Sequence, residues 1–309
     1  MSDEPHAVVV DAHAHLFTHS FFQALARQAG KLLPPGDELQ AIHERTGVEI
    51  AAEPLEPLAA RWVQEMDRHG IQGMVLMSSI PGDHRSSTAA ARLHPNRIIP
   101  YAMFHPLEEG ACDELRASAG EGLRGVCLFP AMHHFHADHD KVLEFISVAA
   151  ELRLIVFVHF GLLRLGLRDK LGLPSPFDLR YSNPIELCRA AQQFPQLPFV
   201  VPHLGAGFFR EALLLASQCP NVHLDTSSSN SWVRTQPGRL ALGDALIQAL
   251  EVVGSRRLLF GSDSNVFPRG FRRDVLDSQI AIFRDRGISR EEEVRIFGGN
   301  LLRLLETAA

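Results

Sequence analysis

Eight short apolar segments alternate with helical patterns along the chain, and this alternation constrains the fold more than any other feature. The segments are Val8–Val10, Gly73–Met77, Ile98–Phe104, Gly125–Phe129, Leu154–Val158, Pro198–Pro202, Asn221–Thr226 and Leu258–Gly261. The helical patterns between them are Leu55–His69, Arg85–Leu93, Glu109–Ser118, Lys141–Glu151, Pro184–Gln193, Arg210–Ser217, Arg239–Val253 and Phe271–Arg286. Strict alternation indicates parallel strands whose outer face is covered by helices.

Eight such units predict an α/β fold of the (β/α)₈ TIM-barrel class. A doubly wound open sheet is the alternative, but no glycine-rich phosphate loop follows the first strand. The stretch Phe17–Glu53 is expected to be an inserted lid or substrate loop after strand 1, and Ile288–Leu305 to add two short C-terminal helices. No linker divides residues 1–309, so a single domain is expected.

Composition argues against several classes of function. The formal net charge is −6, and Lys and Arg form no stripe, so we expect no nucleic-acid partner. The longest apolar run, Leu154–Leu163, is far shorter than the roughly 20 residues of a membrane span, so we expect no membrane partner. The four cysteines are widely separated, and the N-terminus has acidic residues where a signal peptide would be basic. We therefore expect a cytoplasmic protein with free thiols that acts on a small molecule.

Histidine is unusually frequent, with 16 residues, and a His-x-His pair follows the first predicted strand. Residues two apart on a strand share a face, so His13 and His15 should point the same way, together with Val9 and Asp11. The carboxyl ends of barrel strands form the active sites of such folds. His13 and His15 are therefore candidate metal ligands.

Three further strands end in a polar residue: His159 ends the fifth, His203 the sixth and Asp263 the eighth. Each could individually be a hydrogen-bonded polar residue at a strand end. Five such groups converging on one end of a barrel would stabilise one another poorly without a cation, because buried His and Asp side chains need a partner. The set therefore predicts a metal site.

These residues lie in motifs that resemble a known family. DAHAHL at 11–16, HFG at 159–161, PHLGAG at 202–207, NVHLDTS at 221–227, FGSD at 260–263 and GGNLLRLL at 298–305 occur in its order. Together they resemble the amidohydrolase superfamily, in the amidohydrolase-related (amidohydrolase 2) branch. That branch also includes enzymes like aminocarboxymuconate-semialdehyde decarboxylase. The resemblance extends from Val8 to Leu305.

The resemblance implies one divalent metal ion held by His13, His15, His159 and Asp263. His203 would lie beside the metal-bound water or the substrate carbonyl. Three imidazoles and one carboxylate suit Zn²⁺ best, with Mn²⁺, Fe²⁺ or Co²⁺ as substitutes. The family also tends to form homodimers.

The fourth strand departs from the family pattern. Many relatives have a lysine in a GVKLHP-like stretch, and in binuclear members it bridges two metals. Here Cys127 stands at the lysine position and Phe129 at the histidine position. A thiolate could bridge metals, but a cysteine on an apolar strand is more often a small buried hydrophobe, so a mononuclear site is expected. Ser264 and Asn265 replace the Trp-Pro that often follows the final aspartate, which alters the pocket wall.

Candidate substrate contacts follow other strand ends. We select Arg164, Trp232 and His136. Further residues that follow strand ends are His105, Arg180, Arg234 and Arg269.

The expected reaction is metal-dependent hydrolysis of a small amide, ester or lactone by a metal-bound hydroxide. Asp263 would act as ligand and base, and His203 would polarise the carbonyl. The alternative is a metal-dependent non-oxidative decarboxylase (carboxy-lyase) of a small unsaturated or aromatic acid. Such an enzyme must hold a carboxylate, ordinarily with Arg. A metal-binding protein without catalysis is disfavoured, because three imidazoles and one carboxylate normally leave a coordination position open.

Overall fold

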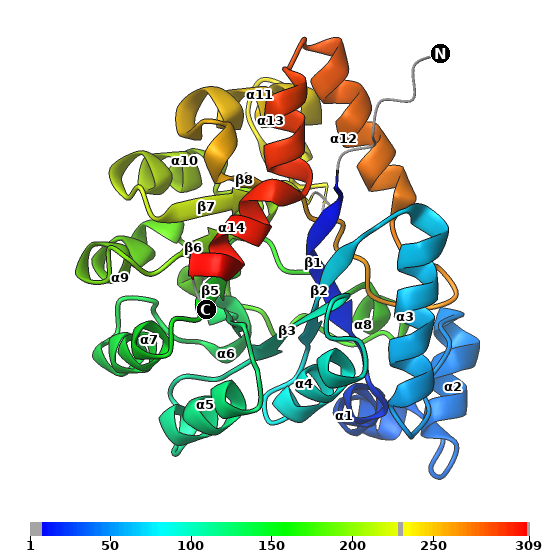
Figure 1. Ribbon diagram of the computed structural model, residues 1–309. Helices are drawn as coiled ribbons and strands as arrows, with labels where there is room; N and C mark the ends of the chain where they lie inside the picture. The colour runs from blue at the N-terminus through cyan, green and yellow to red at the C-terminus, as the bar shows by residue number, and fades with distance from the viewer. Residues whose placement is uncertain (1–7, 228–230, 308–309) are drawn as a thin grey trace.

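The computed structural model describes residues 8–227 and 231–307 and contains a barrel of eight parallel strands. The strands are β1 (Val10–Leu16), β2 (Gly73–Ser78), β3 (Ile98–Met103), β4 (Gly125–Leu128), β5 (Ile155–Val158), β6 (Phe199–Val201), β7 (Val222–Asp225) and β8 (Leu258–Leu259). They pair in this order, and the segment from β8 returns to β1 through backbone bonds from Ala12 N to Phe260 O (2.9 Å) and from His15 N to Ser264 O (2.8 Å). The predicted TIM barrel is confirmed (Figure 1).

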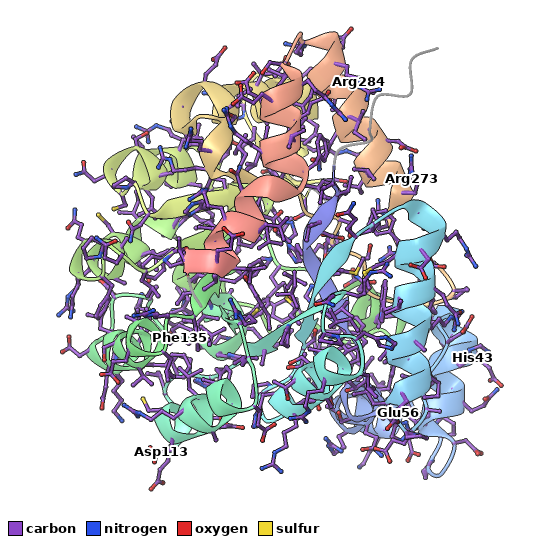
Figure 2. All side chains as sticks on the ribbon, in the orientation of Figure 1. His43, Glu56, Asp113, Phe135, Arg273 and Arg284 are labelled. Atoms are coloured by element: carbon purple, nitrogen blue, oxygen red, sulfur yellow. The ribbon has the colours of Figure 1, made fainter. Side chains whose placement is uncertain are left out.

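Helices surround the barrel (Figure 1). The longer ones are α3 (Glu56–His69), α4 (His84–Leu93), α5 (Ala111–Gly120), α7 (Asp140–Glu151), α9 (Cys188–Gln193), α10 (Phe209–Gln218), α11 (Leu242–Val253) and α12 (Arg273–Asp285). Short helical turns are α6 (Pro130–His133), α8 (Gly166–Lys170), η2 (Leu179–Tyr181), η3 (Pro184–Leu187), η4 (Pro202–Gly205), η5 (Trp232–Thr235) and η6 (Ser255–Arg257). Charged side chains such as Asp113 and Arg284 project outward from the helices (Figure 2).

Alternate strand residues pack in two apolar layers. Met77 and Phe157 belong to an inner layer that fills the barrel, and Leu76 and Val158 belong to an outer layer between strands and helices. The interior of the barrel is therefore a packed core, and the active sites of such barrels lie where the strands end.

A β-bulge in β1 changes which residues face the barrel interior. The residues packed in the inner layer are Val10 and Ala12, and those packed in or against the outer layer are Val9, Ala14 and Leu16. The register with β2 shifts between Asp11 and Ala14, so His13 and His15 point inward while Val9 does not. The prediction that the two histidines share a face with Val9 and Asp11 is therefore wrong. A bulge adds one residue and reverses the alternation.

The predicted loop Phe17–Glu53 folds as helices above the barrel. Its elements are α1 (His19–Ala29), η1 (Gly30–Leu32) and α2 (Glu38–Thr46). The Thr18 side chain caps α1 by accepting a hydrogen bond from Phe21 N (3.3 Å). The buried face of α1 packs with Leu167 and Leu171 around α8, in a cluster separate from the barrel layers. This insertion covers the end of the barrel where the histidines lie.

The C-terminal segment closes the opposite end of the barrel. It forms α13 (Arg290–Val294), η7 (Arg295–Gly299) and α14 (Asn300–Thr307), which confirms the two predicted helices. The Asn300 amide donates to the carbonyl oxygens of Ser255 and Leu258, both at 2.7 Å. Leu301 and Leu304 pack into the inner layer. None of the helices in the described part of the chain is long and apolar enough to cross a membrane.

The burial of His223 in β7 predicts that the free energy of unfolding depends on pH. Burial, together with the charge of Arg303, lowers the pKa of His223 to about 4, whereas an unfolded histidine has a pKa near 6.5. As the pH falls, this histidine is protonated in the unfolded chain before it is protonated in the folded protein. Its contribution to the free energy of unfolding is therefore fully present above pH 6.5 and is lost as the pH falls toward 4. At pH 5 we expect a loss of about 2 kcal/mol in unfolding free energy from this residue.

Denaturant unfolding at pH 7.5 and pH 5, with chelator present, measures this effect. His223→Gln should reduce the difference between the two pH values, and His94→Gln, which changes a half-buried histidine, serves as control. An unchanged pH difference in His223→Gln would contradict the prediction.

Candidate metal centre

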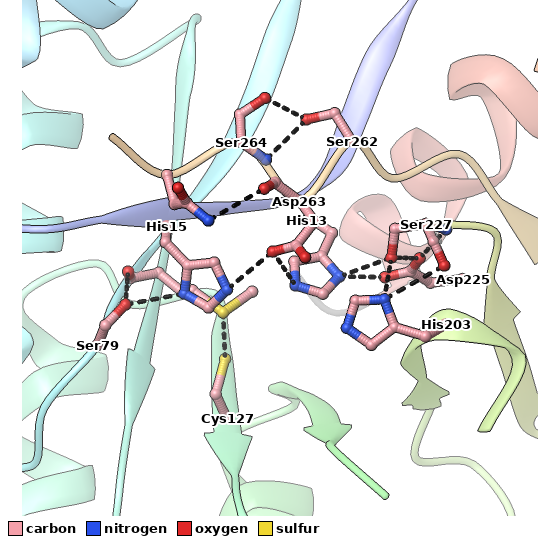
Figure 3. A network of polar contacts seen from close by, with 12 residues as sticks. His13, His15, Ser79, Cys127, His203, Asp225, Ser227, Ser262, Asp263 and Ser264 are labelled. Carbon is pink, nitrogen blue, oxygen red and sulfur yellow. Dashed lines mark hydrogen bonds and ion pairs between the residues drawn. The ribbon is translucent and has the colours of Figure 1, made fainter. Parts of the chain in front are cut away.

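His13, His15 and Asp263 meet at the carboxyl end of the barrel strands (Figure 3). His13 Nε2 lies 3.6 Å from Asp263 Oδ1, and His15 Nε2 lies 3.3 Å from the same oxygen. One ligand atom from each residue lies within 4.8 Å of the others. Two imidazole nitrogens and a carboxylate oxygen that converge in this way are donors that first-row divalent metals accept.

Hydrogen bonds hold the other nitrogen of each imidazole. His13 Nδ1 lies 2.5 Å from Asp225 Oδ2, and His15 Nδ1 lies 2.9 Å from Ser79 Oγ. Such bonds fix the orientation of a ring and direct its Nε2 toward a metal. Asp225 is not among the residues predicted for the site, although it ends an apolar strand as His159 follows one. Applying the same criterion to β7 would have found it.

Gly261 makes the contact between His13 and Asp225 possible. A Cβ atom at this position would lie 2.7 Å from Asp225 Oδ1 and 2.8 Å from His13 Cβ. These distances are shorter than van der Waals contact. The glycine of the FGSD motif is therefore required by the close approach of these two side chains.

Asp11 supports the bulge that turns the histidines inward. Its Oδ1 accepts hydrogen bonds from His13 N (2.9 Å) and Ser262 N (3.0 Å), and Ser262 Oγ donates to Oδ2. A bulge leaves a backbone amide without a strand partner, and the carboxyl group supplies one here. Burial is the main cause that raises the pKa of Asp11 to about 7.

The buried charges of the site favour a cation. Burial lowers the pKa of His13, but the charge of Asp225 and its hydrogen bond outweigh burial and raise the pKa to about 9. Burial raises the pKa of Asp263, but the hydrogen bond with His15 and the charge of His13 hold it well below its ordinary range. The two carboxylates thus attract positive charge to His13. A metal cation at Nε2 would replace the proton there.

His159 borders the same cavity but lies outside the group formed by the other three predicted ligands. Its ring centroid lies 5.4 Å from that of Phe129 and 5.1 Å from that of His203. Its Nδ1 is buried and has no hydrogen-bond partner among the residues described. Burial holds the pKa of His159 well below its ordinary value, so the ring is neutral. The donor atoms of His13, His15 and Asp263 fit a divalent metal, and His159 lies on the wall of the same cavity with a buried nitrogen that no described residue satisfies.

His203 and Asp263 both adopt a left-handed backbone conformation, with φ of 55° and 56°. Residues other than glycine are uncommon in this region and often occur at functional sites. His203 Nδ1 lies 3.2 Å from the carbonyl oxygen of Ser227 and 2.8 Å from its Oγ. A carbonyl oxygen can only accept, so the ring proton is on Nδ1. In its neutral form His203 therefore offers Nε2 as a hydrogen-bond acceptor.

A cavity that is open to solvent lies beside these residues, and the space within it and its mouth together is about 560 Å³. Ser79, Arg164 and Asn265 are polar groups on its wall, in addition to the residues described above. Apolar side chains form most of the remaining wall and include Phe17, Phe21, Phe129, Met132, Leu163 and Phe177. Phe17 and Phe21 come from the inserted segment, which confirms that this segment lies over the site.

One of the three predicted substrate contacts lines this cavity. Arg164 lines it, and Arg164 Nη2 lies 2.7 Å from Asp169 Oδ2. His136 is exposed, and its Nδ1 forms a hydrogen bond with Glu186 Oε1 (3.0 Å). Trp232 is buried against Phe209, with ring centroids 5.4 Å apart, because its indole packs onto α10. Neither His136 nor Trp232 is among the described residues that line the cavity.

Cys127 lies in the inner layer of the barrel. Its Sγ is 3.8 Å from Met77 Sδ, and burial raises the pKa of its thiol well above the ordinary value. Cys127 is in none of the groups of candidate ligands that the described residues form. A neutral thiol in this position packs as a small hydrophobe.

The contact between His13 and Asp225 predicts that the Asp225 carboxylate strengthens metal binding. Asp225→Asn should keep the shape of the side chain but lose its charge, so the affinity for a divalent metal should fall about 10- to 100-fold. Competition titration with a chromophoric chelator measures this affinity. Asp178→Asn, which changes a half-buried carboxylate paired with Arg180 and outside the groups of candidate ligands, is the control. Equal affinities for Asp225→Asn and the unmodified protein would contradict the proposed role.

The chain belongs to the amidohydrolase family, whose model (amidohydrolase 2) matches residues 10–307. Protein fluG of Emericella nidulans is 35% identical over 111 residues, which are 35% of this chain and 12% of the length of that protein. This chain thus corresponds to a small part of that relative.

Solved structures with the same fold include proteins with two kinds of described activity. A putative 2-pyrone-4,6-dicarboxylic acid hydrolase from Pseudomonas putida superposes with a TM-score of 0.65, at 19% identity and 98% coverage of both chains. A dihydroxybenzoic acid decarboxylase from Polaromonas sp., with bound manganese, superposes with a TM-score of 0.62, at 17% identity and 98% coverage of both chains. At these identities the similarity shows the fold alone.

Proposed function

We propose that this protein is a metal-dependent hydrolase of a small, uncharged amide, ester or lactone that carries an apolar group. His13, His15, His159 and Asp263 would hold one divalent metal ion. Three imidazoles and one carboxylate suit Zn²⁺ best, and Mn²⁺, Fe²⁺ or Co²⁺ are alternatives.

The charge of the cavity wall is the observation that favours hydrolysis over decarboxylation. Among the described lining residues, Arg164 alone has a guanidinium or ammonium group. Its side chain is 63% exposed and is paired with Asp169, so its charge is already offset at the solvent boundary. A decarboxylase ordinarily holds its substrate carboxylate with an arginine in addition to the metal, whereas a hydrolase of a neutral substrate needs no such arginine. The apolar walls are suited to an aromatic or aliphatic group.

The site residues supply proton transfer. A divalent metal in this site would contribute Lewis acidity, which polarises a carbonyl group and makes a water molecule more acidic. Asp263 remains ionised and can accept a proton from water at a carboxylate oxygen, then pass it to the leaving group. His203 is a second acceptor at Nε2, and once doubly protonated it can donate a hydrogen bond to a carbonyl oxygen.

A substrate panel tests the proposal. Neutral aryl esters, lactones and anilides are incubated with the metal-loaded protein, and aromatic and muconate-type acids are tested in parallel for CO₂ release. We expect metal-dependent hydrolysis of at least one neutral class, with little effect of Arg164→Ala. Rapid metal-dependent CO₂ release without turnover of esters, lactones or amides would overturn the proposal in favour of decarboxylation.

A further inference from the structure

Two cysteines far apart in the sequence lie in contact outside the metal site. Cys188 begins α9, and Cys219 follows the end of α10. Their Sγ atoms are 3.8 Å apart, and both thiols are free. This distance is van der Waals contact, so no other group separates the two sulfur atoms. The disulfide distance is about 2.0 Å, so bond formation requires a further approach of the two side chains.

We propose that Cys188 and Cys219 are a redox pair that forms an intramolecular disulfide by exchange with a low-molecular-weight disulfide such as glutathione disulfide. In the first step the Cys188 thiolate attacks one sulfur of glutathione disulfide, forms a mixed disulfide and releases one glutathione thiolate. In the second step the Cys219 thiolate attacks Cys188 Sγ and releases the second glutathione. Two protein thiols are oxidised and one glutathione disulfide is reduced to two glutathione thiols, because the two protons that leave the cysteines are taken up, through solvent, by the two released glutathione thiolates.

The surroundings of the two sulfur atoms determine the order of the steps. Cys188 is half-buried and borders an open surface hollow of about 870 Å³, together with Arg189 and Gln192. Cys219 is 1% exposed, and burial with the contact to Cys188 raises the pKa of its thiol to about 11. An external disulfide can therefore reach Cys188 but not Cys219. Cys219 then acts on the adjacent mixed disulfide from within the protein.

The disulfide would join segments that lie on either side of β6. Asn221 already connects this region, because its side-chain amide donates to the carbonyl oxygens of Ala191, Phe194 and Leu197 at 3.0–3.1 Å. The covalent loop would contain β6 and the turn that carries His203. Closing such a loop restricts the unfolded chain, so the oxidised protein should unfold at a higher temperature than the reduced protein.

The remaining cysteines provide matched controls. Cys127 is buried beside a methionine sulfur, and Cys112 is half-buried on α5. Neither has a thiol contact among the described residues. Cys112→Ser therefore tests whether a partly accessible cysteine outside the pair contributes to the oxidation.

The test incubates the full-length reduced protein with glutathione disulfide, followed by intact mass, peptide mapping and titration of thiols after denaturation. We expect the loss of two hydrogen masses, a Cys188–Cys219 cross-linked peptide and a higher unfolding midpoint that dithiothreitol reverses. Cys219→Ser should stop at one glutathionyl group on Cys188, Cys188→Ser should form no internal bridge, and Cys112→Ser should behave as the unmodified protein.

Three results would overturn the proposal. One is a stable glutathionyl adduct on Cys188 of the unmodified protein without closure. The second is a bridge that involves Cys112, and the third is retention of both thiols. Circular dichroism of each serine variant before oxidation establishes that it is folded, so that an absent bridge reports on the cysteine pair.

Discussion

Substituting His13 by alanine should abolish both metal binding and activity, whereas His203→Ala should keep the metal and lose most of the activity. His13 presents Nε2 to Asp263 and is held by Asp225, so its loss removes a ligand from the site. His203 lines the cavity and hydrogen-bonds to Ser227 through Nδ1. Its loss should remove proton transfer and cost about 10²- to 10⁴-fold in kcat. Elemental analysis and kinetics on the same preparations measure both effects.

His94→Ala, which changes a half-buried histidine away from the described cavity, is the control and should retain metal and activity. His203→Asn, which cannot accept a proton as imidazole does, should resemble His203→Ala. If His203→Ala loses metal as completely as His13→Ala, His203 is a ligand and the division of roles proposed above is wrong.

Asp263→Asn should be the most damaging conservative substitution in the cavity. The change keeps the size of the side chain but removes the charge that His13 and His15 face, and it removes the proposed base. We expect a kcat loss of at least about 10³-fold together with weaker metal binding. Steady-state kinetics at saturating metal separates the two effects, because weak binding alone is restored by excess metal. Near-normal kcat at saturating metal would show that the carboxylate is not the base.

Much of the architecture could be predicted because the strands are continuous apolar segments between amphipathic helices. The carboxyl ends of parallel strands meet at one end of a barrel, so a polar residue that ends a strand is placed there by topology alone. This reasoning brings His13, His15 and Asp263 to one point. It also places His159 beside the same cavity.

The missed features depend on local geometry that alternation does not describe. The bulge at Asp11–Ala14 reverses the faces of β1, and its support comes from Ser262 in a distant segment. Asp225 was missed because its importance comes from its contact with His13. The burial of Trp232 depends on how a loop packs after it leaves a strand, which strand patterns do not contain.

The insertion after β1 was expected as a loop, yet it contains α1 and α2. The helical spacing of Phe21, Phe22 and Leu25 is the signal that could have been used. Their partners are residues of α8, far along the chain, so the packing of the segment was not readable from its own sequence.

Elemental analysis of protein purified without chelator tests the central claim most directly, because one metal shell accounts for the buried histidines and carboxylates of the site. We expect about one equivalent of a divalent transition metal per chain, released by chelator together with activity and absent from His13→Ala. Two tightly bound metals per chain would contradict a mononuclear centre and return Cys127 to consideration as a bridge. Full activity without any divalent metal would contradict the metal-dependent mechanism itself.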